Sequence, residues 1–304
     1  MELKNKVLAL VVTYNRKDLL LECVDALLKQ ELACDILVID NASTDGTQEV
    51  LSPFVMSGQI GYINTGENLG GAGGFNFALK EGASRDYDYF WLMDDDTIAH
   101  PDTLQEFMNA ANALDNHFGY LSSFARFTDG KPCQMNLQDV TKDWYEGIEV
   151  YNGLVKIERA TFVSFFIKKE TVMAYGLPIK EFFIWVDDTE YSLRIAKHLP
   201  CYLVQSSQIT HKMQVNASTG WRIFMNENSD RVDRYFYNVR NKFYVNKQNG
   251  FLSSVSYLAK QVVLSLLLLF GSKHYRFKKF AIVWKGVFAG LTFNPPIEYL
   301  EEKK

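Results

Sequence analysis

The sequence has 304 residues, the length of one large domain or of two coupled ones. With 47% hydrophobic and 22% charged residues, its composition excludes a disordered, collagen-like or coiled-coil chain. A formal net charge of −4 excludes the strongly basic balance typical of nucleic-acid binders, so we expect no nucleic-acid partner.

Cysteine spacing and apolar segments bear on the compartment. The cysteines include no CxxC pair, so we expect free thiols in a reducing compartment, the cytoplasm; they are Cys23, Cys34, Cys133 and Cys201. The apolar stretch 7–12 is too short for a signal-peptide core. The nearest candidate for a spanning helix is the nine-residue run 262–270, about half the necessary length, so we expect no spanning helix and leave a surface-lying one open.

Strand and helix patterns alternate through the first hundred residues. Short runs of β-branched, aliphatic and aromatic residues predict strands at 7–13, 35–40, 60–64 and 87–93. Helices are predicted at 18–29, after the capping segment 41–46, and from the end of the glycine-rich loop 66–74 to about residue 82. This alternation predicts a mainly parallel α/β sheet with right-handed crossovers.

The pattern is looser after Pro101. It predicts helices at 102–114 and from Asp187 through Lys197, strands within 119–127, 149–168 and 202–211, and a polar loop at 128–144. From about residue 228 the chain has helical patterns. We therefore expect an α/β domain at 1–225 and a helical C-terminal extension at 226–304.

Three adjacent carboxylates, Asp94, Asp95 and Asp96, directly follow the apolar strand 89–93. Ligands bind at the carboxyl ends of strands in open α/β sheets. Adjacent carboxylates repel one another unless a cation or hydrogen-bond donors offset their charge, so the cluster indicates a divalent ion such as Mg²⁺ or Mn²⁺. The alternative is a solvated acidic turn before the next helix.

Thr13 and Asp40 end the first two strands and should open on the same sheet edge as the acidic triplet. A nucleotide base could be held there, although Asp40 could instead form a turn. The loop 66–74, with Asn68, Gly70 and Gly71, allows close backbone approach and leads into a helix N-terminus suited to an anionic or polar ligand. A purely steric role for its glycines is equally compatible with the sequence.

A carboxylate pair, Asp187 and Asp188, follows the apolar segment 182–186. An apolar wall can raise the pKa of a carboxylate enough for it to act as a general base near neutral pH. Helix N-termini also favour Asp for electrostatic reasons alone. His211 closes a later strand and could complete a carboxylate metal site or serve a structural role.

These motifs, in their order and spacing, resemble those of the family 2 inverting glycosyltransferases over about residues 5–225. The segments that carry the resemblance are 11–16, 38–47, 68–75, 94–96, 187–188 and His211. The resemblance implies the GT-A nucleotide-sugar-binding fold and a hexosyltransferase that uses Mn²⁺ or Mg²⁺. Because every expected carboxylate is present, it favours an enzyme over a non-catalytic nucleotide-sugar-binding subunit. A nucleotidyltransferase would need a lysine-containing phosphate loop that the sequence lacks.

The resemblance also implies roles for individual residues. The nucleotide-sugar ligands would be Thr13, Tyr14, Arg16, Asp40, Asn68, Gly70, Gly71, Asp94 and Asp95, with Thr13 and Asp40 on the uracil or thymine and Asp94 or Asp95 on the ribose. The metal ligands would be Asp96, His211 and Asp94. Asp188 would be the catalytic base, and Asp187 and Trp185 would bind the acceptor.

The glycine-rich loop and the Trp185-Val186-Asp187-Asp188 segment look most like galactofuranosyltransferases, which use UDP-galactofuranose. Val186 departs from the pattern in which tryptophan directly precedes the pair of aspartates. Bacterial rhamnosyltransferases, which use dTDP-rhamnose, share much of the same pattern and are the alternative. The implied acceptor is a saccharide, often polyprenyl-linked, in the synthesis of a cell-surface polysaccharide such as O-antigen or capsule.

The C-terminal segment 251–291 is cationic and rich in aromatic residues. Its basic residues are Lys260, Lys273, Arg276, Lys278, Lys279 and Lys285. This composition is typical of an interfacial anchor, which would place the protein peripherally on the anionic inner face of the cell membrane. The alternative is a helical cap on the catalytic domain or the contact of a homo-oligomer.

Overall fold

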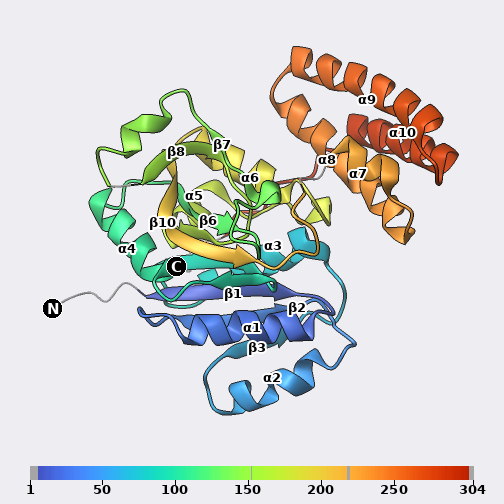
Figure 1. Ribbon diagram of the computed structural model, residues 1–304. Helices are drawn as coiled ribbons and strands as arrows, with labels where there is room; N and C mark the ends of the chain where they lie inside the picture. Colours follow the sequence, from blue (N-terminus) through green and yellow to red (C-terminus); the bar gives the residue numbers. More distant parts are fainter. Residues whose placement is uncertain (1–5, 152, 218–219, 301–304) are drawn as a thin grey trace.

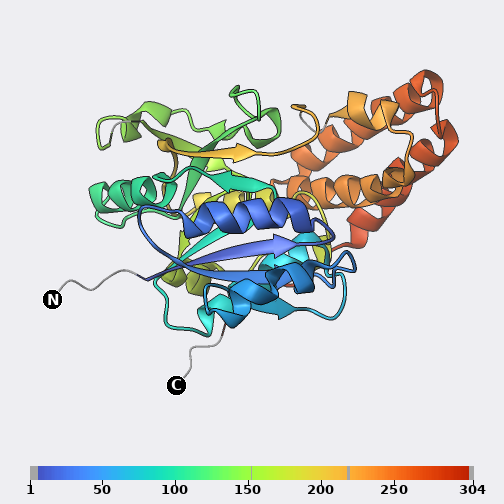
Figure 2. The same ribbon diagram turned by 60° about the horizontal axis from the view of Figure 1, so that its bottom comes forward.

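The computed structural model describes residues 6–151, 153–217 and 220–300. In this part of the chain a ten-stranded mixed sheet carries helices on both faces, and a group of helices projects from one side, as the orange and red ribbons show (Figure 1 and Figure 2). The α/β fold class with a helical C-terminal region is confirmed.

The first four predicted strands form one parallel half of the sheet, in the order β3-β2-β1-β4. These strands are β1 (Val7–Thr13), β2 (Asp35–Asp40), β3 (Gly61–Asn64) and β4 (Tyr89–Asp94). The helices between them are α1 (Lys17–Leu28), α2 (Thr47–Met56) and α3 (Gly70–Ala83). The alternation of apolar strands and amphipathic helices therefore predicted this half correctly.

The other half is mixed, because β9 (Phe165–Lys168) pairs antiparallel with β4 and with β6 (Tyr120–Arg126). The remaining strands are β5 (Thr97–Ala99), β7 (Asp139–Val140), β8 (Leu154–Arg159) and β10 (Cys201–His211). The helices are α4 (Thr103–Ala113), α5 (Lys169–Tyr175) and α6 (Asp187–Ala196), with short 3₁₀ turns at Gln134–Asn136, Trp144–Gly147, Lys180–Phe182 and Asp230–Arg234. The patterns had not predicted β5 or α5, which are too short to show a period.

The core lies on both faces of the sheet, as expected for an apolar strand such as β1. Alternate β1 residues pack with α1 and α4 on one face and with α3 and α6 on the other. Trp91 on β4 is fully buried, and its indole N–H donates to the Ser164 hydroxyl at 2.9 Å. All four cysteines are free thiols, as predicted.

Helix α3 begins at Gly70, whereas the sequence had predicted a loop through residue 74. The glycines form the first turns of the helix because they allow close packing. A Cβ on Gly74 would lie 2.6 Å from Val12 Cγ1, and one on Gly70 would lie 2.1 Å from the Phe183 carbonyl oxygen. Gly70 also has a positive φ of 71°. Steric demands therefore explain two of these glycines.

Replacing Gly70 by alanine is expected to destabilise the protein by about 2 kcal/mol or more, because alanine there meets both backbone strain and the Phe183 carbonyl. Gly71→Ala is the matched control, since a Cβ at Gly71 meets no atom within 4 Å. Alanine favours the helix, so the control should be as stable as the unchanged protein or slightly more so. Urea unfolding of both variants measures the difference, and equal midpoints would contradict the steric explanation.

The helical region contains α7 (Trp221–Asn226), α8 (Tyr235–Gln248), α9 (Phe251–Gly271) and α10 (Arg276–Thr292) around a small core of its own. Helix α7 straddles the expected boundary at residue 225. The chain after α10 returns to the part of the molecule that carries the sheet, where the Leu177 N–H donates to the Glu298 carbonyl at 2.8 Å and Lys80 pairs with the Glu298 side chain. The division into 1–225 and 226–304 stays a prediction.

Helix α9 is longer than the apolar run on which the expectation of no spanning helix was based. It has 21 residues and, by length and composition alone, could cross a membrane. Only 22% of its most apolar window is buried, so it is not a core helix of the usual kind. Lys279, predicted as part of a basic surface, is instead fully buried, and its ammonium group donates to the Met225 carbonyl at 2.8 Å.

Candidate active site

The strand register brings the predicted residues to one edge of the sheet. Thr13 on β1 pairs with Asp40 on β2, and Val12 pairs with Asp94 on β4. The carboxyl ends of the three strands therefore lie side by side, as predicted. The Thr13 hydroxyl donates to Asp95 at 2.8 Å, which joins the end of the first strand directly to the acidic triplet.

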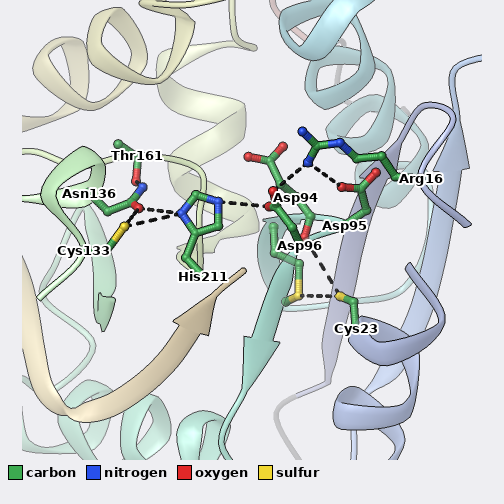
Figure 3. Close-up of polar contacts among 10 residues, drawn as sticks. Arg16, Cys23, Asp94, Asp95, Asp96, Cys133, Asn136, Thr161 and His211 are labelled. Carbon is green, nitrogen blue, oxygen red and sulfur yellow. Dashed lines mark hydrogen bonds and ion pairs between the residues drawn. The ribbon is translucent and has the colours of Figure 1, made fainter. Parts of the chain in front are cut away.

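A short strand brings His211 to this edge. Strand β5 pairs antiparallel with β10 so that Thr97 lies opposite His211, and the Lys212 N–H donates to the Asp96 carbonyl at 2.9 Å. As a result His211 Nε2 lies 3.0 Å from Asp96 Oδ1, as Figure 3 shows. Asp96 and His211, both predicted as metal ligands, are thus in contact across 115 residues of sequence, and their role as ligands stays a prediction.

The second ring nitrogen of His211 is held by residues that the sequence did not single out. Nδ1 lies 2.7 Å from the Asn136 side-chain oxygen and 3.7 Å from the Cys133 sulfur (Figure 3). Both come from the segment 128–144, predicted as a plain polar loop. No periodic pattern marks such residues, because only the folded chain brings a loop onto a distant strand.

The charges of this cluster are strongly coupled. Burial lowers the pKa of His211, but the hydrogen bonds to Asp96 and Cys133 and the charge of Asp96 outweigh it and raise this pKa to about 10. Burial has the opposite effect on Asp96 and raises its pKa, but the hydrogen bonds and charges of His211 and Arg16 outweigh burial and hold this pKa below normal. Arg16 Nη1 lies 2.6 Å from Asp96 Oδ2 and 3.3 Å from Asp95 Oδ1. Asp96 therefore lies between two cations.

The other two carboxylates have raised pKa values, because burial and the neighbouring carboxylates disfavour their ionised forms. Burial, with the charges of Asp96 and Asp95, raises the pKa of Asp94 to about 7. Burial also raises the pKa of Asp95 to about 6, although Arg16 opposes the shift. In the described part of the chain, no hydrogen bond or ion pair is formed by the Asp94 carboxylate. An added cation would relieve this repulsion.

The donor set fits a divalent ion by its chemistry: carboxylate oxygens suit Mg²⁺ and Mn²⁺, and an imidazole nitrogen favours Mn²⁺ of the two. The geometry is not that of a formed metal site. Among the described residues, no group of three or more His, Cys, Asp and Glu side chains is arranged to hold a metal ion. Asp96 and His211 instead bond to each other, so His211 must release its Nε2 proton before it can ligate.

The second pair of carboxylates begins α6, as predicted. The Thr189 N–H donates to Asp188 Oδ1 at 2.6 Å, and Asp187 is almost fully buried. Burial, followed by the charge of Asp188, raises the pKa of Asp187 well above normal, and Asp94 adds to this shift. Burial also raises the pKa of Asp188, against the opposing effect of its bond from Thr189. Burial therefore raises the pKa of both carboxylates at the start of α6.

Several predicted ligands already have local partners. The Asp40 carboxylate is fully buried and accepts from the Ser43 N–H at 2.8 Å and the Tyr62 hydroxyl at 2.7 Å, the turn-forming role that was its alternative. Asn68 Oδ1 accepts from the Gly70 N–H at 2.9 Å. Tyr14 is exposed. The contacts of these residues with a nucleotide stay predictions.

Trp185 packs toward the helical region. Its ring lies 5.1 Å from that of Tyr235, centroid to centroid, and it joins the core of α8, α9 and α10. Its contact with an acceptor stays a prediction. Arg159 on β8, which sequence reasoning missed, pairs with Asp139, and its charge acts on Asp188.

The sequence model described as Glycosyl transferase family 2 matches residues 9–170, which is more than half of the chain. This chain belongs to glycosyl transferase family 2. It is therefore a glycosyltransferase, and the matched span includes the ends of β1, β2 and β4 where the acidic triplet lies. The family that the sequence motifs resembled is confirmed.

Among curated proteins, the galactofuranosyltransferase GlfT1 of Mycolicibacterium smegmatis is 24% identical over 262 residues, 80% of this chain and 84% of that protein. Among solved structures, S. aureus TarS superposes with a TM-score of 0.54 at 13% identity over 95% of this chain, which spans only 44% of TarS. The mannosyltransferase PcManGT from Pyrobaculum calidifontis, solved with GDP-Man and Mn²⁺, superposes with a TM-score of 0.53 at 17% identity. The match covers 94% of this chain and 87% of PcManGT. These likenesses confirm the GT-A fold.

Proposed function

We propose that this glycosyltransferase is an inverting, divalent-metal-dependent enzyme that moves galactofuranose from UDP-galactofuranose to a saccharide of a cell-surface polysaccharide. The observation that carries the proposal is a pair of carboxylate clusters, one in contact with His211 at the strand edge and one at the start of α6, close enough for the charge of Asp94 to act on Asp187. The likeness to galactofuranosyltransferase GlfT1 supports the choice of donor sugar.

In this mechanism Asp188 accepts the proton of an acceptor hydroxyl, whose oxygen attacks the anomeric carbon as the nucleoside diphosphate leaves. Asp187, which is buried beside Asp188, binds the acceptor together with Trp185. Thr13, Asp40 and Asp95 line the nucleoside side. Asp96 and His211, with Asp94, would hold Mn²⁺ or Mg²⁺. When bound, the ion supplies Lewis-acid stabilisation of the departing diphosphate, worth several kcal/mol.

The proposal is tested by measuring binding and slow hydrolysis of UDP-galactofuranose, dTDP-rhamnose and other nucleotide sugars with Mn²⁺, with Mg²⁺ and with EDTA. Neither measurement needs the acceptor. We expect selective, metal-dependent engagement of UDP-galactofuranose. Selection of dTDP-rhamnose would establish the rhamnosyltransferase alternative. Binding of no nucleotide sugar with either metal would contradict the proposal and favour a non-catalytic subunit.

The pH dependence of transfer offers a second check. Asp188 must be ionised to accept a proton, and burial raises its pKa above the ordinary 3.8. Protonation at low pH therefore removes the base, so kcat should fall on the acid side with a midpoint above about 4. The profile is measured at saturating donor and metal, because His211 makes metal binding pH-dependent as well. A kcat that stays constant down to about pH 4 would contradict this prediction.

We also propose that the protein binds peripherally to the inner face of the cell membrane, a location consistent with a polyprenyl-linked acceptor. Helix α9 exposes Phe251, Leu252 and Phe270, each at least 80% exposed, and basic side chains stand nearby on α9, α10 and their connection. The exposed basic residues are Lys260, Lys273, Arg276, Lys278 and Lys285, of which Lys278 pairs with Asp233. Apolar side chains beside basic ones suit an anionic lipid surface.

Phe270→Ser is expected to weaken binding to vesicles of anionic phospholipid by about 10- to 100-fold, because an inserted phenyl group contributes about 1.5–3 kcal/mol. The control is Met56→Ser on α2, where the side chain is 79% exposed but lies outside the helical region. Sedimentation at low and high salt measures the binding. Binding that is unaffected by lipid charge, or lowered equally by both variants, would favour a cap or an oligomer contact.

A further inference from the structure

The segment that leads into α6 is held in a strained backbone conformation. Phe183, Trp185 and Val186 have positive φ angles of 63°, 66° and 72°. A side chain in this region costs roughly 1–2 kcal/mol, and a β-branched residue such as Val186 is seldom found there. Asp187 and Asp188 follow immediately, so the strain fixes the direction in which both carboxylates leave the loop. Such a conformation persists only where the surroundings enforce it.

The surroundings that enforce it come mainly from one residue of the helical region. Asn241, on α8, is fully buried. Its side-chain NH₂ group lies 3.0 Å from the Phe182 carbonyl oxygen, 3.2 Å from that of Ile184 and 2.9 Å from that of Trp185. One amide therefore ties together three of four successive carbonyls.

Two further groups complete the arrangement. Arg240 Nη2 donates to the Glu181 carbonyl at 2.6 Å and to the Phe182 carbonyl at 3.3 Å. The Ala72 N–H, at the start of α3, donates to the remaining carbonyl, that of Phe183, at 3.1 Å. Every carbonyl from 181 to 185 thus accepts a hydrogen bond from outside the loop.

We propose that Asn241 is a positioning residue for glycosyl transfer, which holds the loop 182–186 so that Asp188 meets the acceptor hydroxyl. The inference rests on the proposed role of Asp188 as the base. Misplacing a reacting group by about 1 Å can cost about 10²-fold in rate. On this account the helical region is part of the catalytic apparatus, whatever else its exposed face binds.

The test compares Asn241→Leu, which keeps the shape and removes the donors, with Asn241→Ser, which is smaller and leaves room for water to reach the carbonyls. The control is Asn246→Leu on the same helix. Asn246 donates to the Lys242 carbonyl of its own helix at 2.8 Å and accepts from Ser253, without a bond to the loop. All variants are made in the full chain, and their thermal midpoints are measured first.

We expect both Asn241 variants to lose about 10- to 100-fold in kcat with UDP-galactofuranose and Mn²⁺, while the donor dissociation constant stays within about threefold. Backbone hydrogen exchange of residues 182–190 should quicken in both, and Asn246→Leu should change neither property. If Asn241→Leu does not fold, the kcat and the hydrogen exchange of Asn241→Ser alone test the inference. A kcat in Asn241→Ser equal to that of the control would overturn the inference.

The same experiment separates this inference from the proposed function. If the unchanged protein transfers and hydrolyses no nucleotide sugar, the proposed function fails, and the catalytic meaning of Asn241 fails with it. If the unchanged protein is active and the Asn241 variants keep normal kcat despite faster exchange, only the positioning role fails. A loss of donor binding equal to the loss of kcat would also overturn it, since that pattern indicates general damage to the site.

Discussion

Asp188→Asn is expected to lower sugar transfer by about 10²- to 10⁴-fold while donor binding is retained, because the amide keeps the shape of the carboxylate and cannot accept the proton. The Thr189 N–H, which donates to Asp188 Oδ1 at 2.6 Å, can donate equally to an amide oxygen. The start of α6 should therefore remain intact. Steady-state kinetics with the donor that the panel selects measure the loss, and titration with that donor measures its affinity.

Asp102→Asn is the matched control for this substitution. Asp102 precedes α4 much as Asp188 begins α6, but it is exposed and makes no side-chain cap hydrogen bond. The same chemical change there should leave kcat within about twofold, since exposed substitutions change stability by no more than about 0.5 kcal/mol. If Asp188→Asn turned over as fast as this control, the assignment of the base would be wrong, and Asp187 would be the next residue to replace.

Asp96→Asn is expected to weaken metal-dependent donor binding by about 10²-fold or more, because in the proposed mechanism Asp96 is a charged ligand of an ion that supplies several kcal/mol. The substitution should also change the pKa of His211 when no metal is present. Asp96 is the main source of the raised pKa of His211, about 10, so that pKa should fall toward its ordinary value near 6.5 in the variant. Nuclear magnetic resonance titration of the imidazole protons measures this shift directly.

Asp86→Asn is the control, because the Asp86 side chain is 94% exposed and pairs only with Lys6 among the described residues. It should alter neither donor binding nor the titration of His211. The two readouts of Asp96→Asn separate two conclusions. If the pKa of His211 falls and metal-dependent donor binding is unchanged, the ion pair between Asp96 and His211 is confirmed and Asp96 is excluded as a metal ligand. An unchanged His211 pKa would contradict the hydrogen bond itself.

Much of the candidate active-site edge of the sheet was predictable, because local sequence patterns and simple topology determine it. Apolar runs of strand length end at Thr13, Asp40 and Asp94, and parallel strands joined by right-handed crossovers must bring those ends together. The helix beginning at Asp187 was predictable for the same reason, since its acidic first turn and its apolar spacing are both local. The family resemblance followed from these same motifs.

The glycine-rich segment marks the limit of such reasoning. Its glycines were compatible with a ligand or with close packing, and the structure assigns Gly70 and Gly74 to packing against Phe183 and Val12. The start of α3 was misplaced because glycine is a poor helix former, and only tertiary contacts explain why a helix forms there. Lys279 is a similar case, since composition placed it on a basic surface and packing buried it.

The sequence by itself determined the parallel half of the sheet, the family and the two clusters of carboxylates, because strand length, helical period and adjacent charges are properties of neighbouring residues. Only the tertiary structure decided what holds those clusters. Asn136 reaches His211 across 75 residues, and Asn241 reaches the loop before Asp187 across nearly 60. A single asparagine in a loop or helix has no distinguishing local pattern, because its partners are backbone and side-chain groups that folding alone brings within 3 Å.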